Sequence, residues 1–251
     1  MSKELKYKVI KPEDSLADFV ESFWFLQNQT DSNKEIILLP DGRVDLIFTS
    51  YPSQPIQTTL LGMATKPDHT ILSANTTLFA ISFKLPSVEY VIKKPVPELL
   101  DSAEHLSENF WEFTATNFNN FQHFIQKASH RIQSVLPQHI DNRKEKLFEL
   151  IYTSKGEMTV KELAENAGWS SRQINRYFNQ HFGLSLKTYC NILRFRASFK
   201  HLKEGKLYPQ QDFTDQSHFI KEVKKLSGVS PKELKQNHND RFIQFSTLVS
   251  K

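Results

Sequence analysis

The sequence has a single cysteine, only seven glycines and no long apolar run. Cys190 alone cannot form an internal disulfide or complete a cysteine-based zinc site. It falls on the apolar stripe of a predicted helix, so packing is the favoured interpretation and redox sensing the alternative. The longest apolar runs, such as 35–40, are far shorter than the ~18 to 20 residues that cross a bilayer. Residues 1–6 lack the apolar core of a signal peptide, so we expect no membrane association and a cytoplasmic protein.

Patterns typical of catalysis are also scarce. The sequence shows no glycine-rich phosphate loop, no carboxylate pair with a histidine at strand ends and no metal-ligand spacing. His218 has no second ligand at helical spacing, which argues against a metal site there. We therefore expect no metal, no cofactor and no enzymatic activity.

Charge is distributed unevenly along the 251 residues, a length that suits two domains. Residues 1–140 contain 12 Lys and Arg against 16 Asp and Glu, a net charge of −4. Residues 141–251 contain 20 against 12, a net charge of +8. The basic part is expected to bind a polyanion, usually nucleic acid, although a solvated basic surface would have the same composition.

Strand-like runs separated by turn-forming residues fill the first 85 positions. Asp41-Gly42 lies between two of these runs and indicates a hairpin. Helix-like segments replace strands from Ser87 to Leu136, and 137–142 reads as a linker. The predicted strands occupy residues 22–26, 35–39, 44–49, 58–61 and 78–83.

These patterns predict an α+β protein with three parts. A β-rich, barrel-like domain is expected at 1–105, a helical connector at 106–140, and a basic, all-α domain at 141–251.

Two capping boxes mark a pair of helices in the basic part. Thr159-Val-Lys-Glu162 opens the first, which is expected to end at Gly168, and Ser170-Ser-Arg-Gln173 opens the second, which is expected to end at Gly183. Ala164 is small enough for close helix contact, Gly168 can take a positive φ in the turn, and Ile174 can lock the second helix. Together these features predict a helix-turn-helix with its recognition helix at 170–182.

Ile174, Tyr177 and Phe178 form the inner stripe of that recognition helix. Arginine pairs with guanine through two hydrogen bonds, and Asn or Gln does the same with adenine. Arg172 and Arg176, one turn apart, are the favoured base contacts, whereas Ser171 and the amides near Lys187 are better placed for phosphate. The outward side chains that we predict to face DNA are Ser171, Arg172, Gln173, Asn175, Arg176 and Asn179.

An internal repeat predicts a second unit. Residues 178–185 align with 223–230 at a shift of 45 positions, and Ile174 and Arg176 then fall on Phe219 and Lys221. A helix at 185–202 is long enough to span between the two units. A second recognition helix is therefore expected at 214–227.

The basic part resembles the AraC/XylS family of bacterial transcription regulators over roughly 143–236. The resemblance rests on the run 215–231, in which Asp-Gln-Ser-His-Phe is followed by Gly-Val-Ser-Pro. It implies that two units bind adjacent major grooves on one face of the DNA. By position, Arg172, Asn175 and Arg176 would read the first groove, and the second would be read by Gln216, Ser217, His218 and Lys221.

The second unit departs from the family pattern. Only 206–213 separates Gly205 from the cap at Thr214, where the first unit has a regular eight-residue helix. Pro209 opposes a helix interior, and Asp212 stands at the turn glycine. We expect this truncated unit to bind more weakly, or to contact phosphates alone.

The N-terminal runs 39–48 and 79–83 look like the β-rich domain found in one branch of these regulators. Such domains act as effector or dimerisation modules, but no residue can be assigned to a ligand by position. Trp24, Phe25 and Phe48 are candidates to line a pocket, although aromatic residues on strands are more often core.

The favoured function is an effector-responsive, sequence-specific DNA-binding regulator of transcription. Its expected partner is double-stranded DNA, with RNA polymerase, a small-molecule effector and a second copy of the chain as further candidates. A protein-interaction adaptor with a degenerate helix-turn-helix is the alternative. A DNA-modifying enzyme is less favoured, because related repair enzymes need a nucleophilic cysteine in an appended domain and Cys190 lies within the DNA-binding part.

Overall fold

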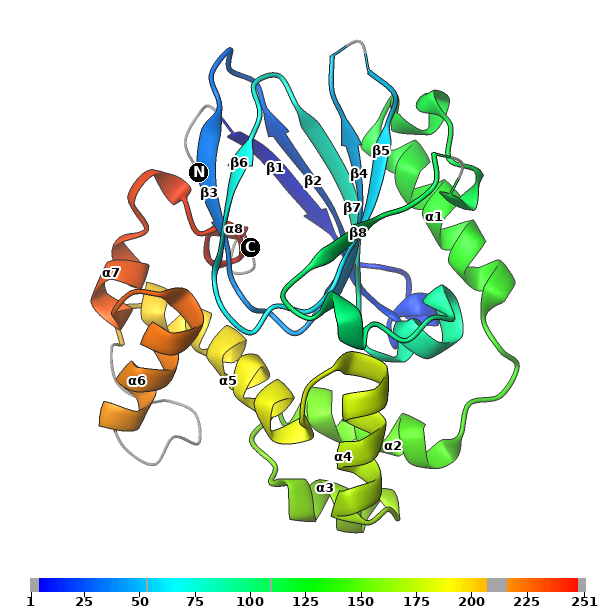
Figure 1. Ribbon diagram of the computed structural model, residues 1–251, viewed down its shortest axis with the longest axis vertical. Coiled ribbons are helices and arrows are strands. Elements are labelled where there is room, and N and C mark those ends of the chain that lie inside the picture. The colour runs from blue at the N-terminus through cyan, green and yellow to red at the C-terminus, as the bar shows by residue number, and fades with distance from the viewer. Residues whose placement is uncertain (1–4, 53, 109, 207–215, 248–251) are drawn as a thin grey trace.

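The N-terminal half forms two antiparallel β-sheets in the residues that the computed structural model describes, which are 5–52, 54–108, 110–206 and 216–247 (Figure 1). Six strands pair in the order β1-β2-β7-β4-β5-β8, and β3 pairs with β6 separately. The strands are β1 Leu5–Ile10, β2 Val20–Asn28, β3 Lys34–Leu38, β4 Val44–Ser50, β5 Gln57–Leu61, β6 Asp68–Leu72, β7 Thr77–Phe83 and β8 Ala103–His105.

The two faces of the six-stranded sheet have different neighbours because side chains alternate along each strand. On one face, Phe48 of β4 and Phe79 of β7 pack against Phe124 of α1 (Phe121–Val135), each with ring centroids 5.5 Å apart. On the other face, Asp45 and Ile47 of β4 line a cavity that also contacts β3 and β6. The sheet therefore has an aromatic face covered by α1 and an opposite face that lines this cavity.

The C-terminal half is helical. This arrangement confirms the predicted class, a β-rich N-terminal region followed by a helical helix-turn-helix region. No helix within the described ranges is long and apolar enough to cross a membrane. The helices are α2 Asn142–Thr153, α3 Val160–Ala167, α4 Ser171–Phe182, α5 Leu186–Lys203, α6 Gln216–Ser227, α7 Pro231–Gln236 and α8 Ile243–Thr247.

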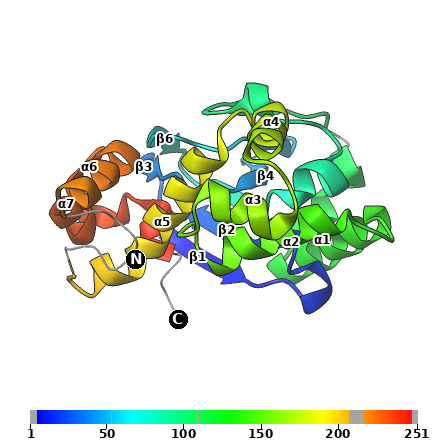
Figure 2. The same ribbon diagram turned by 90° about the horizontal axis from the view of Figure 1, so that it is seen from below.

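Helix α5 belongs to two hydrophobic cores and joins them, and Figure 2 shows it running from α3 and α4 toward α6 and α7. Tyr189 and Leu193 are buried in a core shared with α2, α3, α4 and the six-stranded sheet. Phe195 and Phe199 are buried in a second core with α6, α7 and Ile37 of β3. Both cores therefore contain residues from both halves of the chain.

The chain returns to the N-terminal region after α7. The backbone N–H of Ile37 donates to the carbonyl of Arg241 at 2.7 Å, and the N–H of Leu39 donates to Oε1 of Gln244 at 2.7 Å. Phe242 is fully buried beside Ile37. Helix α8 is thus fixed against β3 and covers part of the cavity.

The predicted hairpin at Asp41-Gly42 is wrong, because β3 pairs with β6 whereas β4 pairs with β5 and β7. The chain bends at Gly42, which has a φ of +73°. A Cβ at this position would lie 3.0 Å from the ring of Tyr189 in α5. The glycine permits close contact with α5 rather than a two-stranded turn.

Cys190 is buried, and burial raises the pKa of its thiol to about 12. Because the thiolate is the reactive form, this environment favours a packing role for the side chain.

Gly183 and Gly168 provide a matched pair for testing how α4 is held. Both take a positive φ, but a Cβ on Gly183 would lie 2.8 Å from the carbonyl oxygen of Pro97, whereas one on Gly168 would meet nothing within 4 Å. We expect Gly168→Ala to lower the free energy of unfolding by about 1 kcal/mol through backbone strain alone. Gly183→Ala should cost clearly more, because Pro97 must also move. Urea unfolding of the two variants checks this, and equal losses would contradict the contact.

Candidate nucleic-acid interface

Helices α3 and α4 begin with the capping boxes that the sequence predicts. Oγ1 of Thr159 accepts from the N–H of Glu162 at 3.2 Å, and the carboxylate of Glu162 accepts from the N–H of Thr159 at 2.8 Å. Ser170 and Gln173 exchange the equivalent bonds at 3.2 Å and 2.9 Å. Gly168 ends α3 with a φ of +67°. The local sequence therefore defines both helices and the turn between them.

The inner faces of these helices pack as the helix-turn-helix pattern predicts. Ala164 and Ile174 are buried where α3 and α4 meet. Phe178 and Phe182 are fully buried against Phe148 of α2, with ring centroids 6.2 Å and 6.4 Å away. Because these side chains occupy the inner stripe, α4 presents its opposite face to solvent.

The two arginines predicted to read bases lie on that exposed face. Arg172 and Arg176 are exposed, and no hydrogen bond or ion pair within the described residues involves either guanidinium group. Ser171, at the start of α4, and Lys187, in the first turn of α5, are also exposed. Both arginines are therefore available to an external partner.

The predicted amide side chains are already engaged within the protein. Oε1 of Gln173 accepts from the N–H of Ser170, as part of the capping box. Nδ2 of Asn175 donates to the carbonyl of Ser171 at 3.0 Å, while its Oδ1 accepts from the N–H of Leu186 at 3.3 Å. Nδ2 of Asn179 donates to the carbonyl of Asn175 at 2.7 Å. Asn175 thus links α4 to the start of α5, a structural role that sequence reasoning missed.

The second unit repeats the first at the predicted shift of 45 residues. Helix α6 has 12 residues, as α4 does, and each is followed by a glycine of positive φ, Gly183 at +77° and Gly228 at +76°. Ser230 then caps α7 through a capping box. The predicted truncation at 206–213 and the cap at Thr214 lie outside the described residues, which resume at Gln216.

Helix α6 brings its predicted DNA contacts to one side. Gln216, Ser217 and Lys221 are exposed, and His218 is half-buried. Sequence reasoning missed Ile220, an exposed large apolar side chain, and Lys224 and Lys225, which are exposed as well. The internal repeat could have identified all three as surface positions. A shift of 45 aligns them with Asn175, Asn179 and Gln180 of α4.

The two recognition units flank α5 (Figure 1). An α-helix rises 1.5 Å per residue, so 18 residues extend about 27 Å. Adjacent major grooves on one face of DNA are about 34 Å apart. The length of α5 is therefore of the order needed for the units to contact successive grooves.

Comparison with known families agrees with this geometry. Residues 163–237 match the model of a helix-turn-helix domain, a range that contains both α4 and α6. The chain carries an AraC-type helix-turn-helix domain. Residues 8–105 match a domain of unknown function (DUF6597).

Solved structures of ToxT from Vibrio cholerae show a distant likeness. One ToxT structure is 13% identical with a TM-score of 0.42 and covers 93% of this chain and 98% of that chain. ToxT from strain O395 is 14% identical with a TM-score of 0.44, with 94% and 98% covered. Wild-type ToxT bound to an unsaturated fatty acid is 14% identical with a TM-score of 0.40, with 91% and 93% covered. No curated protein matches the chain.

The AraC-type domain is docked onto the N-terminal half through Glu89 of the short helical segment η2 (Val88–Ile92). The Glu89 carboxylate accepts from Nζ of Lys144 at 2.5 Å and from the hydroxyl of Tyr177 in α4 at 3.0 Å. The N–H of Val96 donates to the carbonyl of His181 at 2.9 Å. Burial and the Glu89 charge together raise the pKa of Tyr177, which stays a neutral donor. The inner side of α4 is therefore held by the N-terminal half while its outer side remains exposed.

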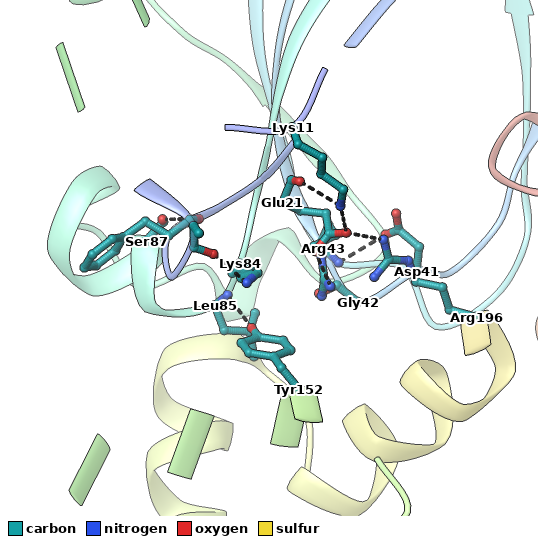
Figure 3. A network of polar contacts seen from close by, with 12 residues as sticks. Lys11, Glu21, Asp41, Gly42, Arg43, Lys84, Leu85, Ser87, Tyr152 and Arg196 are labelled. Carbon is teal, nitrogen blue, oxygen red and sulfur yellow. Dashed lines mark hydrogen bonds and ion pairs between the residues drawn. The ribbon is translucent and has the colours of Figure 1, made fainter. Parts of the chain in front are cut away.

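Helix α5 is held by the interdomain network, which consists of Lys11, Glu21, Arg43 and Arg196 (Figure 3). Glu21 of β2 accepts from Arg43 at 3.0 Å, from Arg196 of α5 at 2.8 Å and from Lys11 at 2.7 Å. The Arg43 side chain is only 2% exposed. Burial alone would raise the pKa of Glu21, but Arg43, Arg196 and Lys11 outweigh it and lower that pKa.

Two tyrosines extend this contact. The hydroxyl of Tyr189 donates to the carbonyl of Gly42 at 3.1 Å and lies 3.2 Å from the hydroxyl of Tyr152 in α2. The guanidinium of Arg43 lies over the ring of Tyr152, 5.2 Å from its centroid. The same short segment of the N-terminal half, Gly42-Arg43, thus contacts both α2 and α5 of the AraC-type domain. Among the described residues, no group of three or more His, Cys, Asp or Glu side chains is placed to hold a metal ion.

Replacing Glu21 tests the network. We expect Glu21→Gln to lower the free energy of unfolding at neutral pH by about 3 kcal/mol, because Arg43 stays buried without its counter-charge. The pKa of Glu21 in the folded protein lies below its usual value of 4.5. The ion pairs therefore contribute their full stabilisation above pH 4.5 and lose it as the pH falls from there toward the folded pKa. The gap between wild type and variant should therefore narrow in acid.

The matched control is Lys11→Met, which removes the exposed member of the same network. Its side chain is 70% exposed, and surface ion pairs contribute about 0.5 kcal/mol. Denaturant unfolding of both variants across a pH series makes the comparison. A Glu21→Gln loss no larger than that of Lys11→Met would contradict the network.

Proposed function

We propose that the protein is a sequence-specific DNA-binding transcription regulator that reads the major groove with α4 and more weakly with α6. The observation that carries the proposal is the pair Arg172 and Arg176, exposed one turn apart and unengaged within the described residues. Arginine pairs with guanine O6 and N7 through two hydrogen bonds, the commonest specific base contact. The outward amides of α4 are engaged in caps and helix bonds, which leaves base reading chiefly to the arginines.

The exposed side chains of α6 suit contacts with the DNA backbone more than base reading. Lys221, Lys224 and Lys225 present ammonium groups that suit phosphates, which position a protein without reading sequence. Ile220, exposed among them, suits contact with a thymine methyl group. We therefore expect the second unit to add affinity for DNA while contributing less than the first to the choice of sequence.

The proposed domains are a β-rich effector or dimerisation domain at 1–105, a helical connector at 106–140 and the DNA-binding domain at 141–251. We also propose that a small molecule regulates the protein and that its partners include RNA polymerase and a second copy of the chain. The proposed regulator has no catalytic activity. The competing function is an adaptor that binds protein rather than DNA.

Fluorescence anisotropy of the full chain tests the proposal. The titrations use DNA from upstream of the chain's own gene and scrambled DNA of equal length, each at two salt concentrations. Preference for the upstream DNA with affinity falling steeply in salt supports a regulator. If the chain binds neither DNA at either salt concentration, the result would favour the adaptor.

Arg176→Ala should weaken binding to the preferred DNA by about 1–3 kcal/mol and relax the choice of base at one position. The loss comes from the two hydrogen bonds to guanine. Anisotropy titrations against a set of single-base operator variants measure it. Arg131→Ala, which removes an exposed arginine of α1, is the control and should change nothing. An equal loss on every DNA would contradict base reading by Arg176.

Lys221→Ala should instead weaken binding to all DNA sequences alike. Log affinity falls with log salt concentration, and loss of one phosphate contact makes this fall less steep by about 0.9. The same titrations over a salt series measure that slope, with Lys146→Ala in α2 as the control. A base-dependent loss with an unchanged slope would show that Lys221 reads bases.

A further inference from the structure

A cavity of about 330 Å³ lies between the six-stranded sheet and the β3–β6 pair. Volumes of this size accommodate small organic ligands. Of the three aromatic residues considered for a pocket, Trp24 lines this cavity, whereas Phe25 and Phe48 lie on the opposite, aromatic face. The apolar part of the wall includes Leu26, Ile47 and Leu78.

Carboxylates predominate among the ionisable side chains of this cavity. Asp41, Asp45 and Asp68 line it together with His105, while neither Lys nor Arg does. Asp68 is exposed at the edge, whereas Asp41 and Asp45 are half-buried. A wall with three carboxylates and neither Lys nor Arg repels anions and favours a cation or a hydrogen-bond donor.

Among the described residues, one carboxylate oxygen of Asp45 lacks a hydrogen-bond partner. Its Oδ1 is buried and accepts no hydrogen bond from any described residue. Burial, reinforced by the charge of Asp41, raises the pKa of Asp45 to about 7, although Ser82, Trp24 and Arg43 favour its charged form. A buried polar atom without a partner is costly, and such atoms in native proteins commonly mark a binding site or a functional group.

The wall opposite the sheet includes the C-terminal segment. Ile243, Gln244 and Thr247 of α8 line the cavity together with residues of β3 and β6. Gln244 is fixed by its bond to the N–H of Leu39. A molecule in the cavity would therefore contact the segment that directly follows the second recognition unit.

We propose that this cavity binds a small amphipathic organic cation, an ammonium ion whose charged group pairs with Asp45 and whose apolar part lies against Leu26, Ile47 and Leu78. The binding itself stands on the cavity, and its consequence for DNA rests on the proposed function. An ammonium group supplies the donor that Oδ1 of Asp45 lacks and complements the negative charge of the carboxylate.

The test compares three probes of equal chain length on the full-length protein, hexylammonium, hexan-1-ol and hexanoate. Calorimetric titration is done at about pH 8, above the pKa of Asp45, where hexylammonium is still protonated. Hexylammonium should bind at least about tenfold more tightly than hexan-1-ol, and hexanoate should not bind. Equal affinity for the ammonium ion and the alcohol, or no binding of the ammonium ion, overturns the proposal.

Three variants locate the site. Asp45→Asn should lose the preference for hexylammonium while keeping hexan-1-ol binding, since only the charge is removed. Ile47→Phe keeps Asp45 but fills the cavity, and should lose both probes. Asp18→Asn, which changes an exposed carboxylate outside the cavity, should behave as wild type. Unchanged hexylammonium affinity in both Asp45→Asn and Ile47→Phe would show that the ion binds elsewhere.

The same preparations distinguish this proposal from the DNA-binding function. A chain that binds DNA with the expected Arg176 dependence but ignores hexylammonium overturns the ligand assignment alone. A chain that binds hexylammonium through Asp45 but no DNA supports the ligand assignment and overturns the regulator.

Discussion

The Glu21 carboxylate between Arg43 and Arg196 is the interaction on which the relation between the two halves depends. Removing three charged groups from water carries a large cost, and only close pairing with complementary charges offsets it. Here the pairing joins β2, the segment before β4 and helix α5 at 2.8–3.0 Å. Because Arg43 is almost wholly buried, no solvent can replace Glu21. The orientation of α5 against the sheet follows from this constraint.

Helix α5 in turn fixes both recognition units. Tyr189 and Leu193 connect it to the core of the first unit, and Phe195 and Phe199 to that of the second. Each unit also has its own tie to the N-terminal half, through Glu89 for α4 and through β3 for the segment leading to α8. The spacing of α4 and α6 is thus not a property of the DNA-binding domain alone. Any change in the sheet that moves these ties would alter the spacing of α4 and α6.

Features set by neighbouring residues were predictable from the sequence, and features set by distant contacts were not. The capping boxes at Thr159 and Ser170 involve residues three apart, so α3 and α4 followed directly from the sequence. Strands β1, β6 and β8 were missed for different reasons: β8 has only three residues, β6 buries only Leu72, and β1 is an edge strand that pairs with β2 alone. The predicted hairpin failed at Gly42 because α5, about 150 positions later, occupies the space beside it. Likewise, nothing local shows that Asn175 bonds to Leu186.

The segment 41–45 brings the proposed ligand and the interdomain network together. Asp41 and Asp45 face the cavity, whereas Arg43 lies between them in sequence and binds Glu21. The pKa of Asp45 already responds to the charges of Asp41 and Arg43, so these groups interact electrostatically. A cation bound at Asp45 would neutralise a carboxylate close to Arg43 and leave Glu21 as its main counter-charge. Because Glu21 also holds Arg196, occupation of the cavity would act on the ion pairs that orient α5, and through α5 on both recognition helices.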